Sequence, residues 1–414
     1  MGNHIIEEAK RCLQCKNPKC KQGCPVNTSI PEVIQLLLNS DIKKAGEMLF
    51  NNNPLSVICS LVCPHENQCE GNCVLGMKGT PVQISSIENY ISSYYLNSSS
   101  LEKNERLNKR VAIIGSGPAG ITIAFMLSLK GYDVTIFEAH DKIGGVLRYG
   151  IPEFRLPKTI LDKLKDKLIE LGVKIRPNTL IGPVIHLSTL ERDGYEAIFI
   201  GTGVWNPNTL NIKGESLGHV HYAIDYLKNP SVYDLGERVC VIGAGNVAMD
   251  VARTAIRRGC KDVYIMYRKD ICDMSATNYE IEYAKIDGVK FETFKTPLEF
   301  VDEGVKYIKT EKIEDESGRI SVVPIEGSED IFEADSIIVA VSQGPKSNIV
   351  STSKGITLNK YGLVITDSLG RTTKEGVFAS GDVVTGAKTV VEAVNLSKKV
   401  AMAIDEYIMK KYEK

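Results

Sequence analysis

Two glycine-rich turns, each lying between a short β-branched run and a helical stretch, place the strongest constraint on the fold of this chain. The first is "VAIIGSGPAG" at residues 111–120, and a looser copy, "VCVIGAGNVAMD", lies at residues 239–250. Around both turns, short buried runs alternate with helices, a pattern that is typical of parallel α/β sheets. A strand that turns through glycines into a helix lets backbone N–H groups approach a pyrophosphate. The sequence therefore predicts two dinucleotide-binding units in one chain.

Composition and charge exclude several classes of function. Hydrophobic residues make up 43% of the chain and charged residues 24%, which is typical of a globular protein. A formal net charge of −1 gives no general attraction to nucleic acid or to an anionic membrane. No apolar run approaches the roughly 20 residues of a membrane span, and the N-terminus lacks the features of a signal peptide. We therefore expect a cytoplasmic protein with no nucleic-acid or membrane partner.

The first turn carries the complete glycine pattern. Gly115, Gly117 and Gly120 follow one strand and open a helix, and Glu138 ends the next strand, "YDVTIFEA". A carboxylate at that place accepts hydrogen bonds from an adenosine ribose. A glycine turn that only packs a helix onto a strand is the alternative, but the strand, the helix and the acidic residue together favour a bound dinucleotide. The expected contacts are Gly115, Ser116, Gly117, Pro118, Ala119, Gly120 and Glu138.

The second turn differs at its third glycine position, where Ala248 stands. Alanine is tolerated there because the requirement is close packing of the helix on the strand. The next strand, "DVYIMYRKD", ends in Arg268 and Lys269, and two cations suit the 2′-phosphate of NADPH. A solvated basic pair at a strand end is the alternative interpretation. The expected NADPH contacts are Gly243, Gly245, Asn246, Val247, Ala248, Arg268 and Lys269.

Cysteines are concentrated before the first turn. One group is Cys12, Cys15, Cys20 and Cys24, and the other is Cys59, Cys63, Cys69 and Cys73. In a reducing compartment, clustered thiols favour metal binding over disulfides. Zinc also uses short cysteine spacings, but both groups contain a Cys-Pro pair, a frequent companion of iron–sulfur ligation. A neighbouring dinucleotide domain also gives redox centres a purpose, so we expect iron–sulfur clusters.

The stretches "GSGPAG" and "GGVLRYGIPEFRLPK" resemble those of a flavoprotein family, and the resemblance covers essentially the whole chain. The family comprises the glutamate synthase small (beta) subunit, the NADPH-side subunit of NADH-dependent ferredoxin:NADP oxidoreductase, and the N-terminal half of dihydropyrimidine dehydrogenase. Residues 144–158 are the most specific part. The resemblance implies that the first turn binds FAD. It adds Gly144, Gly145, Val146, Arg155, Gly381, Asp382 and Thr389 to the FAD contacts, the last at the start of a helix aimed at the flavin.

The same resemblance implies two 4Fe–4S clusters that exchange ligands between the cysteine groups. Its first set is Cys12, Cys15, Cys20 and Cys73, and its second is Cys24, Cys63, Cys69 and Glu88. Cys59 is then left over as a buried structural thiol, although it competes with Glu88 for the eighth position. The chain departs from dihydropyrimidine dehydrogenase at Ser275, where that protein carries an arginine of the NADPH site.

The predicted architecture is of the α/β class. An α-helical iron–sulfur domain precedes two Rossmann-like domains, for FAD and NADPH, with the second inserted in the first. The expected parts are residues 1–108 (two 4Fe–4S clusters), 109–205 (first part of the FAD domain), 206–342 (NADPH domain) and 343–414 (second part of the FAD domain).

The resemblance implies an NADPH-dependent oxidoreductase of the glutamate synthase small-subunit type. Hydride would pass from NADPH to FAD, and single electrons would leave through the clusters to a protein partner, either a glutamate synthase large subunit or a flavin and iron–sulfur subunit. No acid–base side chain is required, so no catalytic residue is assigned. The alternatives are the NADPH-side subunit of a bifurcating ferredoxin:NADP oxidoreductase, which "GAGNVAMD" resembles, a sulfide- or polysulfide-linked reductase, and a non-catalytic partner-holding subunit.

Overall fold

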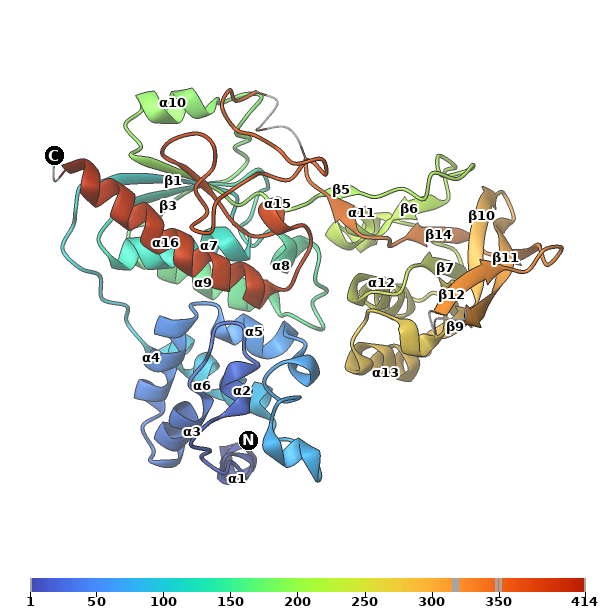
Figure 1. The fold of residues 1–414 in the computed structure, drawn as a ribbon, viewed down its shortest axis with the longest axis horizontal. Coiled ribbons are helices and arrows are strands. Elements are labelled where there is room, and N and C mark those ends of the chain that lie inside the picture. Colours follow the sequence, from blue (N-terminus) through green and yellow to red (C-terminus); the bar gives the residue numbers. More distant parts are fainter. Residues whose placement is uncertain (1, 315–319, 347–348, 350–351, 413–414) are drawn as a thin grey trace. The chain divides into compact units, whose positions relative to one another are not determined.

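A computed structural model gives the fold of residues 2–314, 320–346, 349 and 352–412 (Figure 1). The chain forms two compact units. The first consists of Met1–Arg148, Glu153–Val204 and Pro345–Lys414, and the second of Tyr149–Pro152 and Trp205–Gly344. Neither unit ends near residue 108, so the four-part division of the chain stays a prediction.

The N-terminal part of the first unit is a helical domain (blue in Figure 1). Its elements are α1 (Gly2–Lys10), α2 (Lys19–Gln22), α3 (Ile30–Leu38), α4 (Ile42–Asn52), α5 (Ser56–Val62), the 3₁₀ turns η1 (His65–Asn67) and η2 (Val74–Met77), and α6 (Ile84–Ser98). The chain breaks between α3 and α4 because Ser40 takes a φ of 63°. The Asp41 carboxylate then accepts a hydrogen bond from the backbone N–H of Lys44 (3.1 Å), which caps α4.

A five-stranded parallel sheet forms the rest of the first unit, in the order β16-β4-β1-β2-β3. Its strands are β1 (Arg110–Ile114), β2 (Asp133–Phe137), β3 (Lys174–Arg176), β4 (Ala197–Ile200) and β16 (Val377–Ala379). Its helices are α7 (Pro118–Leu129), α8 (Val146–Tyr149), α9 (Lys158–Glu170), α10 (Leu187–Arg192), α15 (Asp382–Thr385) and α16 (Val390–Tyr412). Helix α7 is apolar on all sides because it packs against β1, β2, α9 and α16.

An aromatic contact joins the helical domain to this sheet domain. Phe50 of α4 packs against Tyr95 of α6, with ring centroids 5.6 Å apart, and against Phe125 of α7, at 5.3 Å with the rings nearly perpendicular. All three residues are buried. Edge-to-face pairs of buried aromatic rings stabilise such a contact by about 0.5–1.5 kcal/mol beyond the area that they bury. The helical domain and the sheet domain are therefore packed as one body.

The second unit contains a parallel sheet of its own, in the order β6-β14-β7-β8-β9. Its elements are β6 (Val220–Tyr222), α11 (Ala223–Lys228), β7 (Arg238–Ile242), α12 (Asn246–Arg257), β8 (Asp262–Tyr267), α13 (Asn278–Asp287), β9 (Lys290–Thr293) and β14 (Ser336–Val339). An antiparallel sheet is made of β10 (Lys295–Val301), β11 (Gly304–Glu314), β12 (Ile320–Pro324) and β13 (Asp330–Glu333). The second glycine turn lies between β7 and α12, as the first lies between β1 and α7.

Buried ion pairs hold α12 against α13. Arg253 donates to Glu280 and to Asp287, each at 2.9 Å, and its side chain is 8% exposed. Burial alone would raise the pKa of Asp287, but Arg253 and Arg257 outweigh it and hold that pKa below its ordinary value. The helix after the second glycine turn is thus fixed to the segment that follows β8.

The two ends of the segment Trp205–Gly344, which makes up most of the second unit, lie side by side. Strand β5 (Asn206–Pro207) pairs antiparallel with β15 (Gln343–Gly344). Ser342, just before β15, takes a positive φ of 72°, which turns the chain towards this short ladder.

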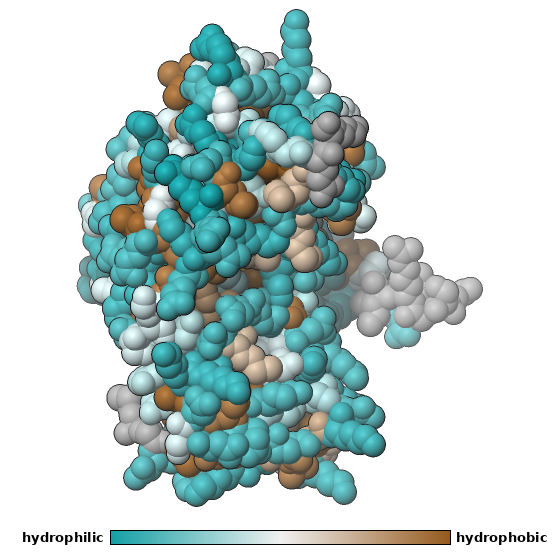
Figure 2. Space-filling view, turned by 90° about the vertical axis from the view of Figure 1, so that its left-hand side faces the viewer, coloured by the Kyte–Doolittle hydropathy of each residue, from teal (hydrophilic) through white to brown (hydrophobic). Residues whose placement is uncertain are grey.

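The face of the molecule in Figure 2 is mostly hydrophilic, with hydrophobic residues scattered over it in small groups. Within the described ranges, no helix combines the length and the apolar character that crossing a membrane requires.

Candidate functional site

The first glycine turn owes its shape to close backbone contacts. A Cβ on Gly120 would lie 2.0 Å from the carbonyl oxygen of Gly115, and a Cβ on Gly115 would lie 2.6 Å from that of Gly201. Gly115 also has a φ of 93°, which favours glycine. Gly117 is different, because nothing lies within 4 Å of where its Cβ would be. The turn therefore leaves open space at its middle glycine, where the Rossmann arrangement brings the backbone close to a pyrophosphate.

Glu138 holds this turn through both of its carboxylate oxygens. Oε2 accepts hydrogen bonds from the backbone N–H (2.9 Å) and the hydroxyl of Ser116. Oε1 accepts from the backbone N–H of His140 (2.8 Å) and pairs with its Nδ1 (2.9 Å). Burial would raise the pKa of Glu138, but the hydrogen bonds from His140 and Ser116 outweigh it and hold the pKa below its ordinary value. The carboxylate is thus ionised and fixes the shape of the turn.

Gly144 and Gly145 lie directly on the first turn. The backbone N–H of Gly144 donates to the carbonyl of Ser116 at 3.0 Å. A Cβ on Gly145 would approach the Cα of Gly117 to 2.8 Å. Val146 begins helix α8, and Arg155 lies half-buried in the turn that precedes α9.

The C-terminal segment reaches the same turn from the far end of the chain. Gly381 takes a φ of 76°, and a Cβ there would lie 3.1 Å from the Cβ of Ala119. Burial raises the pKa of Asp382, the first residue of α15, to about 6. Thr389 accepts a hydrogen bond from the backbone N–H of Glu392, whose carboxylate accepts from the backbone N–H of Thr389 at 3.0 Å. This reciprocal capping box starts α16.

Three segments distant in sequence therefore meet around Gly117: residues 115–120, residues 144–146 and residues 380–382. Their glycines expose backbone at the open space, and Glu138 holds the first of them in shape through Ser116. This donor set fits a dinucleotide such as FAD. Gly201 completes the arrangement and was missed from the sequence, where "IFIGTGVW" gives only the signal of a glycine after a strand.

The second glycine turn follows the same plan. A Cβ on Gly243 would lie 2.4 Å from the carbonyl oxygen of Ala340. Ala248 is fully buried in the first turn of α12, where close packing on the sheet is required. The nearest atom to a Cβ on Gly245 is the hydroxyl of Ser275, at 3.5 Å. As in the first turn, open space remains at the middle glycine, here Gly245, and Ser275 lies beside that space.

Polar groups near this turn come from the segment after β8. The amide oxygen of Asn246 accepts a hydrogen bond from the backbone N–H of Thr277 at 2.9 Å. Val247 is half-buried beside it. Arg268 is exposed and Lys269 half-buried, both directly after β8, and Thr310 donates to the carbonyl oxygen of Arg268 at 2.8 Å. The basic pair thus lies at the carboxyl end of the strand next to the turn, where a 2′-phosphate would be bound.

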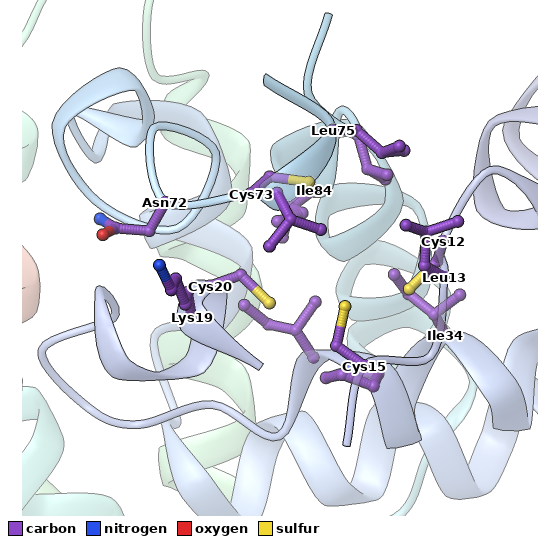
Figure 3. Close-up of a pocket in the computed structure, with 14 residues that line it drawn as sticks. Cys12, Leu13, Cys15, Lys19, Cys20, Ile34, Asn72, Cys73, Leu75 and Ile84 are labelled. Atoms are coloured by element: carbon purple, nitrogen blue, oxygen red, sulfur yellow. The ribbon is translucent and has the colours of Figure 1, made fainter. Parts of the chain in front are cut away.

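Four cysteines of the helical domain line one hollow with about 400 Å³ of space, part of it open to solvent. They are Cys12, Cys15, Cys20 and Cys73, and Figure 3 shows their sulfur atoms around that space. Leu13, also at the hollow, is 60% exposed. Burial raises the pKa of Cys20 to about 11, so iron must displace thiol protons when it binds. Four convergent thiols fit a 4Fe–4S cluster.

The other four proposed ligands lie close enough to interact electrostatically. Burial is the main cause that raises the pKa of Cys69, followed by the charge of Glu88, and Cys24 also contributes. A hydrogen bond with Cys59 and burial raise the pKa of Cys63, and Glu88 and Cys69 add to this. Burial and the neighbouring Glu70 raise the pKa of Glu88 itself to about 8. Cys24, Cys63, Cys69 and Glu88 thus form one neighbourhood of three thiols and a carboxylate, which fits the second cluster.

Two more residues belong to this neighbourhood. Cys59, 3% exposed inside α5, forms a hydrogen bond with Cys63 and remains the competitor of Glu88 for the eighth position. Glu70 is buried, and its Oε1 accepts hydrogen bonds from the backbone N–H (2.8 Å) and hydroxyl (2.7 Å) of Ser85 in the first turn of α6. Glu70 thereby orients the helix that carries Glu88, a role that no spacing in the sequence indicated. Within the described residues, no three His, Cys, Asp or Glu side chains close around a single metal ion.

Comparison with known families agrees with this geometry. The model of the pyridine nucleotide-disulphide oxidoreductases matches residues 109–396. The chain belongs to that family. A second model, described as dihydropyrimidine dehydrogenase domain II, 4Fe–4S cluster, matches residues 1–100.

Individual relatives match over nearly the full chain. The glutamate synthase [NADPH] small chains of Halomonas elongata and Escherichia coli are 34% and 32% identical over 97% of this chain, and over 90% and 91% of theirs. The PreT subunit of the NAD-dependent dihydropyrimidine dehydrogenase of Salmonella typhimurium is 31% identical over 97% of this chain and 94% of its own. The resemblance drawn from the sequence is therefore confirmed.

Solved structures share the fold at lower identity. Mycobacterium tuberculosis FprA in complex with NADPH has a TM-score of 0.64 and 19% identity over 74% of this chain and 86% of its own. The thioredoxin reductase of T. acidophilum has a TM-score of 0.54 and 22% identity over 72% of this chain and 99% of its own. The predicted fold class is confirmed. The chain is an FAD-containing NAD(P)H oxidoreductase with an N-terminal 4Fe–4S domain.

The open space at Gly117 makes a prediction about FAD. Gly117→Ala should fold normally but bind FAD at least tenfold more weakly, because the added methyl group occupies the space next to the pyrophosphate. Gly120→Ala should instead destabilise the fold, because its Cβ collides with the Gly115 carbonyl. Flavin absorbance per protein and far-UV circular dichroism separate the two effects. The control is Gly218→Ala, at a site that is equally open but lies in the second unit. Full FAD content in Gly117→Ala would contradict the assignment of this turn to FAD.

The second ligand set predicts different outcomes for Glu88 and Cys59. Glu88→Ala should lower the iron content and change the electron paramagnetic resonance spectrum of one cluster, because it removes an oxygen ligand. Cys59→Ala should keep the parent iron content, since in this assignment the buried thiol contacts Cys63 but binds no iron. Iron and sulfide analysis after anaerobic reconstitution measures both. The reverse pattern would assign the eighth position to Cys59.

Proposed function

We propose that this chain is the NADPH-oxidising electron-input subunit of a larger oxidoreductase, of the glutamate synthase small-chain type. The observation that carries the proposal is the packing of a thiol-lined hollow and an FAD-type glycine turn in one compact unit. When bound, NADPH, FAD and two 4Fe–4S clusters supply hydride transfer followed by single-electron transfer. The chain's own residues bind and orient these groups, and we assign no acid or base among them.

Each part of the chain has a defined task in this proposal. The three segments around Gly117 would hold the dinucleotide, with Glu138 on the side of its adenosine ribose. Orientation of the reacting groups is the protein's main contribution to such a reaction. The N-terminus of α16, which begins after Thr389, favours negative charge nearby because of the helix dipole. This end of the helix would stabilise the flavin in its reduced, anionic form.

Arg268 and Lys269 support NADPH as the nicotinamide donor. Two cations at the end of β8 can pair with a 2′-phosphate, whereas the 2′-hydroxyl of NADH offers them nothing comparable. Ser275, beside the turn, can add a hydrogen bond but no charge. The relatives differ in this respect, since the glutamate synthase small chains are named for NADPH and the PreT subunit for NAD.

The partner is proposed to be a protein. Several relatives are themselves subunits, among them the glutamate synthase small chains and the beta subunits of an NADP-dependent formate dehydrogenase and of an NADPH-Fe(3+) oxidoreductase. The hollow lined by Cys12, Cys15, Cys20 and Cys73 opens to solvent, which gives electrons an outlet at the surface of the first unit. We propose a glutamate synthase large subunit as the acceptor. A bifurcating ferredoxin:NADP oxidoreductase is the second candidate, because "GAGNVAMD" resembles the loop of its NADPH-side subunit.

The function is tested with the anaerobically reconstituted protein. NADPH should bleach the flavin and reduce an artificial dye with the chain alone, whereas glutamate should form from glutamine only after a glutamate synthase large subunit is added. Rapid dye reduction without glutamate formation, together with co-purification of a small flavin and iron–sulfur subunit, would favour the second candidate. A reconstituted protein that carries no flavin and oxidises no NADPH would contradict both.

The basic pair makes a separate prediction about nicotinamide preference. Arg268→Ala and Lys269→Ala should each raise the KM for NADPH at least tenfold and leave that for NADH unchanged, because only the phosphate contact is lost. Dye reduction with both nicotinamides measures this. The control is Lys261→Ala, an exposed lysine at the opposite end of β8. A parent protein with a clear preference for NADH would contradict the 2′-phosphate assignment.

A further inference from the structure

Lys398 lies in an unusual environment on helix α16. It is half-buried, and its Nζ donates a hydrogen bond to the Oδ1 of Asn52, the last residue of α4, at 2.7 Å. Among the described residues, no carboxylate lies within ion-pair distance of it. A half-buried ammonium group loses part of its hydration, so a negative charge nearby would stabilise it. Asn52 supplies only a neutral acceptor.

The hydrogen bonds continue from Asn52 towards a proposed cluster ligand. The Nδ2 of Asn52 donates to the hydroxyl oxygen of Thr28 at 3.2 Å. Thr28 is buried, and its hydroxyl oxygen lies 3.4 Å from the Sγ of Cys24. Cys24 also interacts electrostatically with Lys398: burial lowers the pKa of that lysine and Cys24 opposes the change. A continuous polar chain therefore links α16 of the sheet domain to Cys24 of the helical domain.

The direction of the donors in this chain matters. Lys398 donates to Asn52, and Asn52 donates to Thr28. Once Cys24 gives up its proton to bind iron, its sulfur can only accept, so the Thr28 hydroxyl turns to donate to it. All three donors then point towards the sulfur, and each polarises the next.

Such an arrangement stabilises the more negative state of an attached cluster. A cluster with thiolate and carboxylate ligands carries negative charge, which increases when it accepts an electron. Hydrogen bonds to the sulfur and a nearby cation both favour that reduced form, and they are established means of setting cluster potentials. The missing counter-charge of Lys398 is then the cluster itself.

The position of Lys398 on α16 relates the two redox parts of the unit. Thr389, at the start of the helix, is a proposed FAD contact, and Lys398 is nine residues further on. At about 1.5 Å per residue, this places the two positions roughly 13 Å apart on one rigid element. One helix thus carries both a flavin contact and the cation that acts on the cluster.

We propose that Lys398 is a positioning residue that, through Asn52 and Thr28, raises the reduction potential of the cluster bound by Cys24. Electrons from the flavin then enter this cluster in preference to remaining on the flavin. The inference rests on the proposed function, because it requires that Cys24 be a cluster ligand.

The test is a redox titration of the reconstituted full chain, followed by electron paramagnetic resonance. Lys398→Met should shift the reduction equilibrium of one cluster at least tenfold towards the oxidised form, which is about 59 mV for one electron. The other cluster should shift less than twofold. Lys399→Met removes the same charge from the exposed neighbouring position and should leave both potentials at the parent value.

Two further variants keep the test decisive. Lys398→Arg retains the charge and should restore the potential to within threefold of the parent equilibrium. Thr28→Val removes the hydroxyl with little change of shape and should shift the same cluster in the same direction, even if Lys398→Met folds poorly. Unchanged potentials in Lys398→Met and Thr28→Val, with both cluster spectra intact, would overturn this inference alone. A parent protein without cluster signals would instead overturn the proposed function.

Discussion

The ring of Phe50, packed between Tyr95 and Phe125, is the contact on which the rest of this structure depends. It joins the cysteine-bearing helices to the helix that follows the first glycine turn. Electron transfer between centres requires a fixed and short separation, which flexible tethering would not provide. Because this contact is buried, the polar chain from Lys398 to Cys24 can form across the same junction at hydrogen-bond distances. A hydrophobic contact thus makes a precise electrostatic one possible.

The two glycine turns share a local design but differ in what surrounds them. The first is contacted by residues 144–146 and by residues 380–382, so a dinucleotide held there is enclosed by three separate parts of the chain. The second is contacted mainly by the single segment after β8, through Ser275 and Thr277.

Features that depend on neighbouring residues in the sequence could be predicted, and features that depend on distant contacts could not. The strands and the two turns follow from β-branched runs and glycine spacing, which are local. The assignment of the cysteines to two sets came only from the family resemblance. Spacing alone could not give it, because Cys73 lines the hollow of the first set although it lies 53 residues beyond Cys20. The role that we propose for Lys398 could not be predicted from the sequence, because its hydrogen-bond partner Asn52 lies 346 positions away. The break between α3 and α4 at Ser40 was also not predicted, since no pattern indicated its positive φ.

The pairing of β5 with β15 has a consequence for how such proteins diversify. The two ends of the segment Trp205–Gly344, which makes up most of the second unit, are neighbours, and the strands on either side of it, β4 and β16, already pair in the host sheet. An insertion bounded in this way behaves as a cassette, since it can be exchanged without changing the distance that the host chain must bridge. Under the proposed function, recombination at these two short strands would exchange the nicotinamide site and leave the proposed flavin and metal sites unchanged.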